Sequence, residues 1–315
     1  MQKNNYQLSI INCQFIEKSF GSTQALKNIS FEVSKGEIFG LIGPDGAGKT
    51  TLFRILTSLI LADSGTATVD GLDVVKDYAE LRKHIGYMPG RFSLYQDLSV
   101  EENLNFYATI FNTTVKENYY LIKDIYQHIE PFKHRRAGKL SGGMKQKLAL
   151  SCALIHKPKV LFLDEPTTGV DPVSRKEFWE MLRRLKEDGI TIVVSTPYMD
   201  EANLCDRIAL IQNGQIFTID TPENIVKQFN KKLFKVQSDN NYLLLEELRK
   251  NPQVESVFMF GDSLHVTFNG ELRMENGELR INDTEHNWLT PNVVSQLKEI
   301  PPSVEDCFIA FNLKK

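Results

Sequence analysis

A glycine-rich stretch near residue 45 has the residue types and the spacing that bind a phosphate chain. It fits the pattern G-x-x-x-x-G-K-T, in which glycines let backbone N–H groups converge on phosphate oxygens. A helix that begins there adds the partial positive charge of its N-terminus. We expect the Lys49 ammonium to reach the β- and γ-phosphates of a nucleotide and the Thr50 hydroxyl to ligate Mg²⁺. The pattern and the threonine after it comprise Gly43, Pro44, Asp45, Gly46, Ala47, Gly48, Lys49, Thr50 and Thr51.

Two adjacent carboxylates follow an apolar run further along the chain. Val160–Leu163 is typical of a buried strand, and Asp164 and Glu165 come directly after it. At a phosphate-transfer site we expect Asp164 to hold Mg²⁺ through a water molecule. We expect Glu165 to act as the general base toward an attacking water. Taken alone, the two acids also fit a solvated strand end, but beside the glycine-rich stretch they complete a nucleotide site.

An alternation of strands and helices must position these two groups. Ile38–Ile42 is a predicted strand that leads into the glycine-rich turn, and Thr50–Leu61 is a predicted amphipathic helix. Ile190–Ser195 is another predicted strand, and the helix predicted before it, Ser174–Glu187, has apolar side chains at helical spacing. Strands that alternate with helices in this way predict an α/β fold with a parallel sheet, and the glycine-rich pattern between strand and helix makes it of the P-loop NTPase type.

Two further regions complete this part of the predicted fold. The first forty residues and Asp63–Val75 alternate apolar and polar residues, which predicts an N-terminal antiparallel sheet beside the parallel one. The chain between Gly90 and Lys157 is almost wholly of helical pattern, so a helical subdomain is predicted over about residues 91–157. Its candidate helices are Glu101–Phe111, Tyr119–Ile129 and Gly142–Ile155.

A small second domain is predicted after the basic stretch Asn230–Lys232. Thr221-Pro222 can cap and start a short helix over Glu223–Phe229, and the boundary follows it. The predicted domains are therefore residues 1–230 and an α+β accessory domain of residues 231–315. The elements expected in the second domain are a strand over Leu233–Gln237, a helix over Tyr242–Lys250, a hairpin turning at Gly261-Asp262, and helices near Pro291–Leu297 and Val304–Phe311.

Composition favours a cytoplasmic protein with a full core. The 315 residues are 42% hydrophobic, which excludes disordered and fibrous classes, and the net charge of −3 gives no basic field for a nucleic-acid partner. Met1–Phe20 has no secretion-signal pattern, and Leu52–Ala62 is shorter than the about 20 residues of a membrane helix. A membrane role therefore requires a separate spanning partner. Reduced thiols without metal-ligand spacing are expected at Cys13, Cys152, Cys205 and Cys307.

A third motif carries a family resemblance. Leu140–Lys147 (LSGGMKQK) resembles the signature of ABC ATPases, and with the two motifs above the chain is identified as a member of that superfamily over about residues 8–230. The resemblance implies that two nucleotide domains meet head to tail, so that the signature of one covers the γ-phosphate of ATP held by the other. Ser141, Gly142 and Gly143 then supply a hydroxyl and unobstructed N–H groups at a helix start.

Other pieces follow in the order of the family. Phe20 is similar to the aromatic residue that stacks on adenine, with a core phenylalanine as the alternative. Gly169-Val170-Asp171 resembles the D-loop, in which Asp171 crosses the dimer interface. Ser93–Asn103 resembles the segment that meets the coupling helix of a membrane permease, and the tail Pro302–Ala310 looks like that of drug-export ATPases. The resemblance therefore implies ATP and Mg²⁺ as cofactors. It also implies a second nucleotide-binding domain and an export-type permease as partners, and a peripheral position on the inner face of the cell membrane.

Two positions depart from the family where the chemistry takes place. Gly90 stands where relatives carry a Gln that touches Mg²⁺ and the attacking water, and Pro197 stands where they carry the switch His. Glycine has no side chain to place water, and proline offers neither an imidazole nor a backbone N–H. Positioned polar groups at such a centre are commonly worth about 10²–10³ each in rate. We therefore predict a degenerate site that binds Mg-ATP, hydrolyses it weakly and pairs with a hydrolysing partner domain.

Three alternatives stay open from the sequence. In the first, both departures are neutral, Glu165 and Mg²⁺ suffice, and the chain is a fully active homodimeric ABC ATPase. In the second, it is a soluble ABC protein of translation or DNA repair, although the paired nucleotide domains and the long coiled-coil insertion of those classes are not found in this sequence. In the third, it is a nonhydrolytic regulator that senses ATP.

Overall fold

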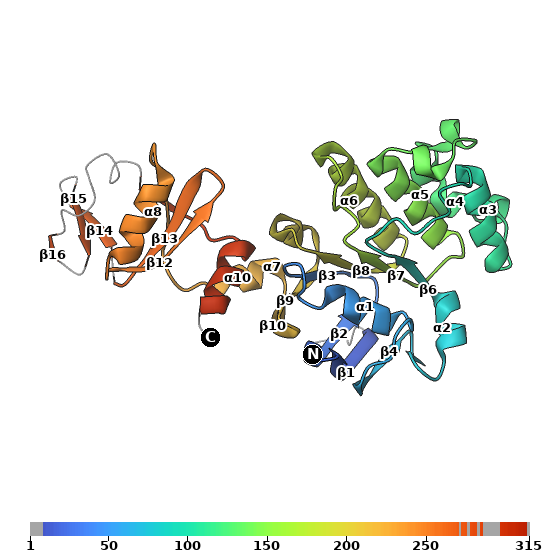
Figure 1. The fold of residues 1–315 in the computed structure, drawn as a ribbon, viewed down its shortest axis with the longest axis horizontal. Coiled ribbons are helices and arrows are strands. Elements are labelled where there is room, and N and C mark those ends of the chain that lie inside the picture. The colour runs from blue at the N-terminus through green and yellow to red at the C-terminus, as the bar shows by residue number, and fades with distance from the viewer. Residues whose placement is uncertain (1–8, 271, 276–277, 282–283, 286–296, 314–315) are drawn as a thin grey trace, which may run out of the picture. The chain divides into compact units, whose positions relative to one another are not determined.

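The chain forms two units in the computed structural model, Met1–Ile225 and Val226–Lys315 (Figure 1). The structure describes residues 9–270, 272–275, 278–281, 284–285 and 297–313. Each unit has its own hydrophobic core. No described helix has both the length and the apolar character that a bilayer crossing requires. All four cysteines are buried, and no disulfide joins them.

A six-stranded sheet runs through the first unit. Its strands are β3 (Ile38–Ile42), β6 (Ile85–Met88), β7 (Val160–Asp164), β8 (Thr191–Thr196), β9 (Arg207–Gln212) and β10 (Gln215–Asp220). They lie in the order β10-β9-β3-β8-β7-β6, and every neighbouring pair is parallel except β10 and β9. β3, β7 and β8 are buried along their whole length, because both faces of their apolar runs are covered. The predicted parallel sheet is confirmed.

A four-stranded antiparallel sheet accompanies the parallel one. Its strands, in the order β2-β1-β4-β5, are β1 (Ser9–Phe20), β2 (Thr23–Ser34), β4 (Ser64–Val69) and β5 (Leu72–Asp73). Side chains from one face, such as Ile11, Ile29 and Val69, are buried in the same core as Phe39 of β3. The alternating pattern of the first forty residues and of Asp63–Val75 therefore predicted this sheet correctly for the part that the structure describes.

The chain between β6 and β7 is helical, as predicted. Its helices and 3₁₀ turns are α3 (Val100–Ile110), α4 (Val115–Tyr126), η1 (Glu130–Phe132), η2 (Ala137–Lys139) and α5 (Gly142–Leu154). They lie together in the green part of the ribbon (Figure 1). α4 begins four residues before the predicted Tyr119, because Thr114 and Glu117 form a capping box there.

Four of the remaining elements of the first unit connect strands of the two sheets, and a fifth leads from β10 into the second unit. They are α1 (Lys49–Leu56), α2 (Tyr78–His84), α6 (Pro172–Glu187), η3 (Met199–Leu204) and α7 (Pro222–Lys227), whose last residues belong to the second unit. The helix predicted over Thr50–Leu61 was too long. Ser58 adopts φ 57, in the left-handed region, and the Leu59 N–H donates to the Arg54 carbonyl at 2.7 Å, so the backbone leaves the helix after Leu56.

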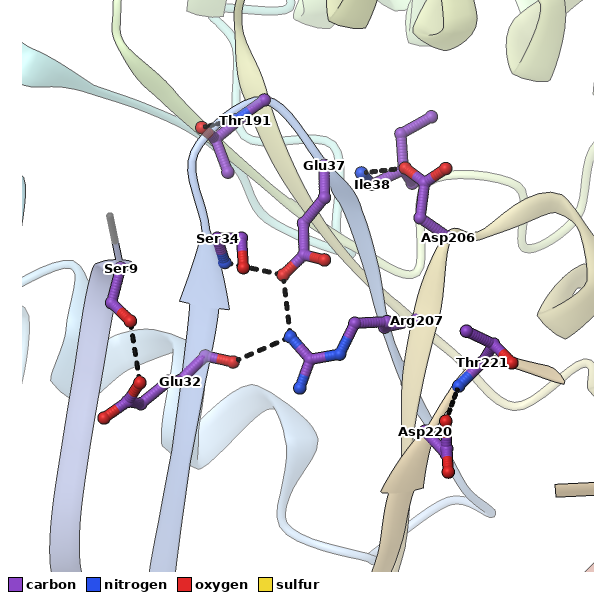
Figure 2. A network of polar contacts seen from close by, with 11 residues as sticks. Ser9, Glu32, Ser34, Glu37, Ile38, Thr191, Asp206, Arg207, Asp220 and Thr221 are labelled. Atoms are coloured by element: carbon purple, nitrogen blue, oxygen red, sulfur yellow. Dashed lines mark hydrogen bonds and ion pairs between the residues drawn. The ribbon is translucent and has the colours of Figure 1, made fainter. Parts of the chain in front are cut away.

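A polar network fixes the end of β3 that lies opposite the glycine-rich loop (Figure 2). Glu37 Oε1 accepts hydrogen bonds from the Ser34 N–H at 2.6 Å and from Arg207 Nη1 at 3.1 Å. Burial raises the pKa of the Glu37 carboxyl above its ordinary value. Thr191, the first residue of β8, accepts a hydrogen bond from the Gly36 N–H at 2.9 Å. Side chains thus tie together the starts of the strands that end at the site.

Phe53 joins α1 to the central sheet. Its side chain is fully buried, and its ring lies edge-on to that of Phe162 in β7 at 5.6 Å between centroids. We expect Phe53→Ala to lower the free energy of unfolding of the first unit by about 3–5 kcal/mol, measured by urea denaturation. Tyr120→Ala removes a ring that is 62% exposed and serves as the control, with an expected loss below about 0.5 kcal/mol. Equal losses would contradict this view of the core.

The second unit is a small α+β arrangement. Its elements are a sheet of β11 (Leu233–Val236), β12 (Val254–Phe260), β13 (Ser263–Phe268) and β17 (Lys298–Ile300), the helices α8 (Asn241–Lys250) and α10 (Val304–Leu313), and a second sheet of β14 (Leu272–Glu275), β15 (Glu278–Ile281) and β16 (Thr284–Glu285). β12 and β13 pair on either side of Gly261-Asp262, so the predicted hairpin is confirmed. The helix predicted near Pro291–Leu297 lies, apart from its last residue, outside the described residues.

Candidate functional site

The loop of residues 43–48 joins β3 to α1, and close packing fixes its glycines. A Cβ atom on Gly43 would lie 2.0 Å from the Ile211 carbonyl oxygen, and one on Gly48 would lie 2.6 Å from that of Ala25. Gly48 also adopts φ +104, which side-chain-bearing residues rarely do. Both ends of the loop therefore require glycine. The other predicted residues of the pattern lie in this loop or in the first turn of α1: Pro44, Asp45, Gly46, Ala47, Thr50 and Thr51.

Lys49 is the first residue of α1, and its ammonium is held inside the loop. The residue is only 3% exposed. Its Nζ donates to the Gly43 and Pro44 carbonyl oxygens at 2.8 and 3.0 Å, and it lies 3.2 Å from Glu165 Oε1. A buried cation with this many oxygen partners has lost most of its side-chain freedom already. The structure thus brings Lys49 and Glu165, which come from separate sequence motifs, into direct contact.

The donor set at this loop fits a phosphate chain. The N-cap of α1 is Gly48, which forms no side-chain cap, and the first turn of the helix contains no acidic residue. The N–H groups at the helix start therefore meet neither a side-chain cap nor a carboxylate of their own turn. Oxygen donors suitable for Mg²⁺ are supplied by Thr50 and Asp164. Backbone donors, the Lys49 cation and oxygen ligands are the chemistry that a magnesium nucleotide needs.

Asp164 and Glu165 lie at the end of β7, beside the loop. Asp164 is 2% exposed, whereas the Glu165 side chain is about one quarter exposed. Glu165 adopts φ 50, in the left-handed region, which is uncommon for a residue with a side chain. Strained backbone of this kind persists where the surroundings determine it, and such places are often functional.

Ser195 of β8 bridges the two acidic residues, and the sequence analysis did not identify it as part of the site. Its Oγ donates to Asp164 Oδ1 at 2.6 Å and accepts from the Glu165 N–H at 3.1 Å. The Glu165 N–H also lies 3.0 Å from the Ser195 carbonyl oxygen. A buried serine at the carboxyl end of a neighbouring strand was the available signal. This signal indicates a contact with Asp164 only once β8 is known to lie next to β7.

Gly90 and Pro197 both lie close to this group. A Cβ atom on Gly90 would lie 3.1 Å from the Asp164 carbonyl oxygen and 3.8 Å from Glu165 Cβ. Pro197 follows the last residue of β8, Thr196, whose carbonyl oxygen accepts the Gly43 N–H at 3.2 Å. The structure therefore brings both departures from the family pattern to the loop and the carboxylates, where neither contributes a polar side-chain atom.

Ser141 and the two glycines after it begin α5. The Ser141 hydroxyl accepts a hydrogen bond from the Met144 N–H at 3.4 Å and so caps the helix. Ser141 and Gly142 are exposed. A Cβ atom on Gly143 would lie 3.0 Å from Ser174 Oγ, so this glycine permits a close approach of α5 to α6. The start of α5 thus presents its hydroxyl at the surface.

Asp171 caps α6 next to this helix start. Its carboxylate accepts the N–H groups of Val173 and Ser174 at 3.1 and 3.0 Å. The bond from the Ser174 backbone is the main reason that the pKa of Asp171 lies below its usual range. A Cβ atom on Gly142 would lie 3.6 Å from the Gly169 carbonyl oxygen, so the segment 169–171 and the start of α5 lie close together.

The group formed by residues 141–143 and Asp171 is separate from the phosphate loop of residues 43–48. Within the described part of the chain, neither Ser141 nor Asp171 forms a hydrogen bond or ion pair with Lys49 or with the acids that follow β7. The residues predicted to contact a nucleotide in trans therefore gather at one place, and those predicted to bind it in cis gather at another.

Phe20 ends β1 and is 52% exposed, so the alternative of a core phenylalanine is wrong. The Lys18 ammonium lies 5.5 Å from the centroid of its ring. The ring is accessible to a flat ligand such as adenine. Stacking on adenine stays a prediction.

A cavity of about 210 Å³ opens between β6 and the helical block. Its lining includes the aromatic residues Tyr87 and Tyr107, together with Ser93 and Leu94 from the segment Ser93–Asn103. Burial, and then a nearby carboxylate charge, raises the pKa of Tyr87 to about 12. The segment that resembles a permease contact thus borders an apolar cavity.

Comparison with known proteins gives consistent matches along the chain. The family model described as ABC transporter matches residues 26–168. The chain is 38% identical over 308 residues to the probable multidrug ABC transporter ATP-binding protein YbhF of Escherichia coli, covering 96% of this chain and 52% of YbhF. It thus spans about half the length of that relative. It is 34% identical to the Nod factor export ATP-binding protein I of a Rhizobium species, covering 93% of this chain and 94% of that protein.

A solved structure shares the fold of the first unit. It is the dimeric ATP-binding cassette MJ0796 in a post-hydrolysis state bound to ADP and Pi, with a TM-score of 0.61 and 25% sequence identity. The match covers 67% of this chain and 98% of that one. The α/β fold with an antiparallel subdomain and an extra C-terminal region agrees with the predicted fold class.

Proposed function

Because this chain belongs to the ABC transporter family of ATP-binding proteins, we propose that it binds Mg-ATP at the loop of residues 43–48. The observation that carries the proposal is the buried Lys49 ammonium, held at the start of α1 and in contact with Glu165. Thr50 and Asp164 are the proposed Mg²⁺ ligands, and bound Mg²⁺ neutralises charge on the β- and γ-phosphates. The exposed ring of Phe20 is proposed to stack on adenine.

The chain is proposed to pair head to tail with a second nucleotide-binding domain. Ser141, Gly142, Gly143 and Asp171 gather apart from the phosphate loop, which suits contact with a nucleotide held by a partner. The dimeric arrangement of MJ0796 supports this proposal by likeness. In such a pair, each site is closed by donors from the other chain, so binding of nucleotide and closure of the dimer are the same event.

Hydrolysis at this chain's own site is proposed to be weak. The groups proposed to bind the triphosphate include Lys49, whereas Gly90, beside Glu165, and Pro197, directly after β8, contribute no polar side-chain atom. Two missing groups at about 10²–10³ each leave little turnover. In the proposed pair, this chain's site holds ATP and the partner's site hydrolyses ATP. Ser141 of this chain completes the partner's site.

The proposed work of the pair is export through a membrane permease. The relatives YbhF and Nod factor export ATP-binding protein I are named for multidrug transport and for export, which supports this direction. The cavity bordered by Ser93 and Leu94 is proposed to receive the permease, with the chain peripheral on the cytoplasmic face of the membrane. Residues 231–315 are proposed to form an accessory domain.

The proposal is tested on the purified full chain without a partner. Calorimetric titration with ATP and Mg²⁺ is expected to show binding. Turnover is expected far below the roughly 1–10³ s⁻¹ that is usual for enzymes. Turnover within that range would reject the weak site and favour the homodimeric ATPase, and the absence of binding would reject the nucleotide site itself. Co-purification with a multi-span membrane protein tests the transport role, and a chain found only without one would favour the soluble regulator.

A further inference from the structure

Ser195 lies on β8 directly beside the acidic end of β7. In the parallel pair of β7 and β8, Asp164 is the register partner of Ser195. The Ser195 side chain is completely buried. Its hydroxyl therefore has no solvent to bond with, and the Asp164 carboxylate and the Glu165 backbone N–H determine its orientation.

The hydrogen bonds assign a direction to this hydroxyl. A serine hydroxyl has one proton to donate and lone pairs to accept with. The Glu165 N–H can only donate, so Oγ accepts it at 3.1 Å, and the hydroxyl proton is directed to Asp164 Oδ1 at 2.6 Å. This arrangement fixes one carboxylate oxygen. Asp164 Oδ2 accepts no hydrogen bond within the described part of the chain, and it is the oxygen left for a cation or for water bound to a cation.

We propose that Ser195 is a positioning residue for the divalent cation that accompanies the nucleotide. Its hydroxyl holds the Asp164 carboxylate in one orientation, and the same oxygen is a second acceptor, beside the Ser195 carbonyl oxygen, for the N–H of Glu165. The inference rests on the proposed binding of Mg-ATP at this site. In this proposal Ser195 touches neither nucleotide nor metal. It determines the orientation in which the Asp164 carboxylate binds the metal. Hydrogen-bond partners of metal-binding carboxylates commonly contribute 10–100-fold in metal affinity.

Removal of the hydroxyl has a specific expected effect. In Ser195→Ala, Asp164 Oδ1 stays buried without its partner, and the carboxylate is no longer held in one rotamer. The affinity of the nucleotide-loaded protein for Mn²⁺ is expected to fall by about 10–100-fold. Nucleotide affinity in EDTA is expected to stay within about twofold, because the contacts of Lys49 with the loop do not involve Ser195. Ser195→Thr keeps a hydroxyl and is expected to restore most of the Mn²⁺ affinity.

Thr191→Val is the matched control. Thr191 lies on the same strand, is equally buried and also uses its hydroxyl to accept a backbone N–H, but it does so at the opposite end of β8 (Figure 2). This variant removes a buried hydroxyl from β8 without touching the acids. Its Mn²⁺ affinity is expected to match that of the natural chain.

The experiment is a Mn²⁺ titration followed by electron paramagnetic resonance in the presence of a nonhydrolysable ATP analogue, with nucleotide binding in EDTA measured in parallel. A drop confined to Ser195→Ala and to the cation supports the inference. Unchanged Mn²⁺ affinity in Ser195→Ala, an equal drop in Thr191→Val, or loss of nucleotide binding in EDTA would each overturn it. If the natural chain itself shows no cation-dependent binding of nucleotide, the proposed Mg-ATP site fails instead.

Discussion

The chain that carries both Gly90→Gln and Pro197→His is expected to hydrolyse ATP at least about 10²-fold faster than the natural chain. Gly90→Gln returns a polar side chain beside Glu165, and Pro197→His returns one directly after the end of β8, which carries Ser195. The position at Gly90 is tight, because a Cβ atom would lie 3.1 Å from the Asp164 carbonyl oxygen, so this backbone neighbour must shift by a few tenths of an ångström. The measurement is single-turnover hydrolysis with the protein in excess over ATP.

The control for this experiment is the pair Gly90→Ala and Pro197→Ala. It makes the same backbone changes, including the return of an N–H at position 197, but adds no polar side chain. Its rate is expected to stay within about twofold of the natural rate. An equal acceleration in both pairs would show that backbone freedom limits the reaction. An unchanged rate in the Gln and His variant, with ATP still bound, would place the defect elsewhere.

Lys49→Ala is expected to weaken ATP binding by about 10–100-fold. Hydrogen bonds to charged groups contribute about 1.5–3 kcal/mol, and each 1.4 kcal/mol is a factor of ten in affinity. Lys49 is already held in place by the Gly43 and Pro44 carbonyl oxygens, so little further ordering opposes its contact with phosphate. Displacement of a fluorescent ATP analogue measures the affinity, and thermal unfolding of the same sample confirms that the variant is folded.

Lys186→Ala is the matched control for the loss of a lysine. Its ammonium forms an ion pair with Asp206 at 2.6 Å, near the starts of the parallel strands rather than near the loop. ATP affinity is expected to be unchanged in this variant. Binding of ATP by Lys49→Ala as tightly as by the natural chain would mean that the loop of residues 43–48 is not the nucleotide site.

The parts of the site that lie within one strand-loop-helix segment were predictable from the sequence. The phosphate loop, Lys49 and the two acids after β7 are local patterns whose spacing predicts their geometry. Ser195 was not predictable in this way. Its contact with Asp164 requires β8 to lie directly beside β7 in a particular register, although α6 separates the two strands in sequence. Strand order is a tertiary property, and no local pattern near Ser195 encodes it.

The fold shows the same division between local and tertiary information. Strands alternating with helices predicted the parallel sheet of the first unit, and alternating apolar and polar residues predicted the antiparallel one. The end of α1, by contrast, depends on the left-handed backbone at Ser58, which helical periodicity does not reveal. β14 and β15 were not predicted. Their register pairs Glu275 with Glu278 and leaves Asn-Gly between them in the sequence, a dipeptide that favours two-residue hairpin loops. This dipeptide is the local sequence signal for the pair β14 and β15.

The left-handed backbone at Glu165 restricts which amino acids evolution can place at this position. With φ at 50, a β-branched side chain would be a severe conformational outlier, whereas glycine and asparagine adopt this geometry readily. In a saturation library selected for protein abundance alone, Val and Ile should therefore be depleted and Gly and Asn retained. In a relative that has lost the carboxylate at position 165, glycine or asparagine is therefore the expected replacement. Either residue there would indicate relief of backbone strain rather than a new chemical role.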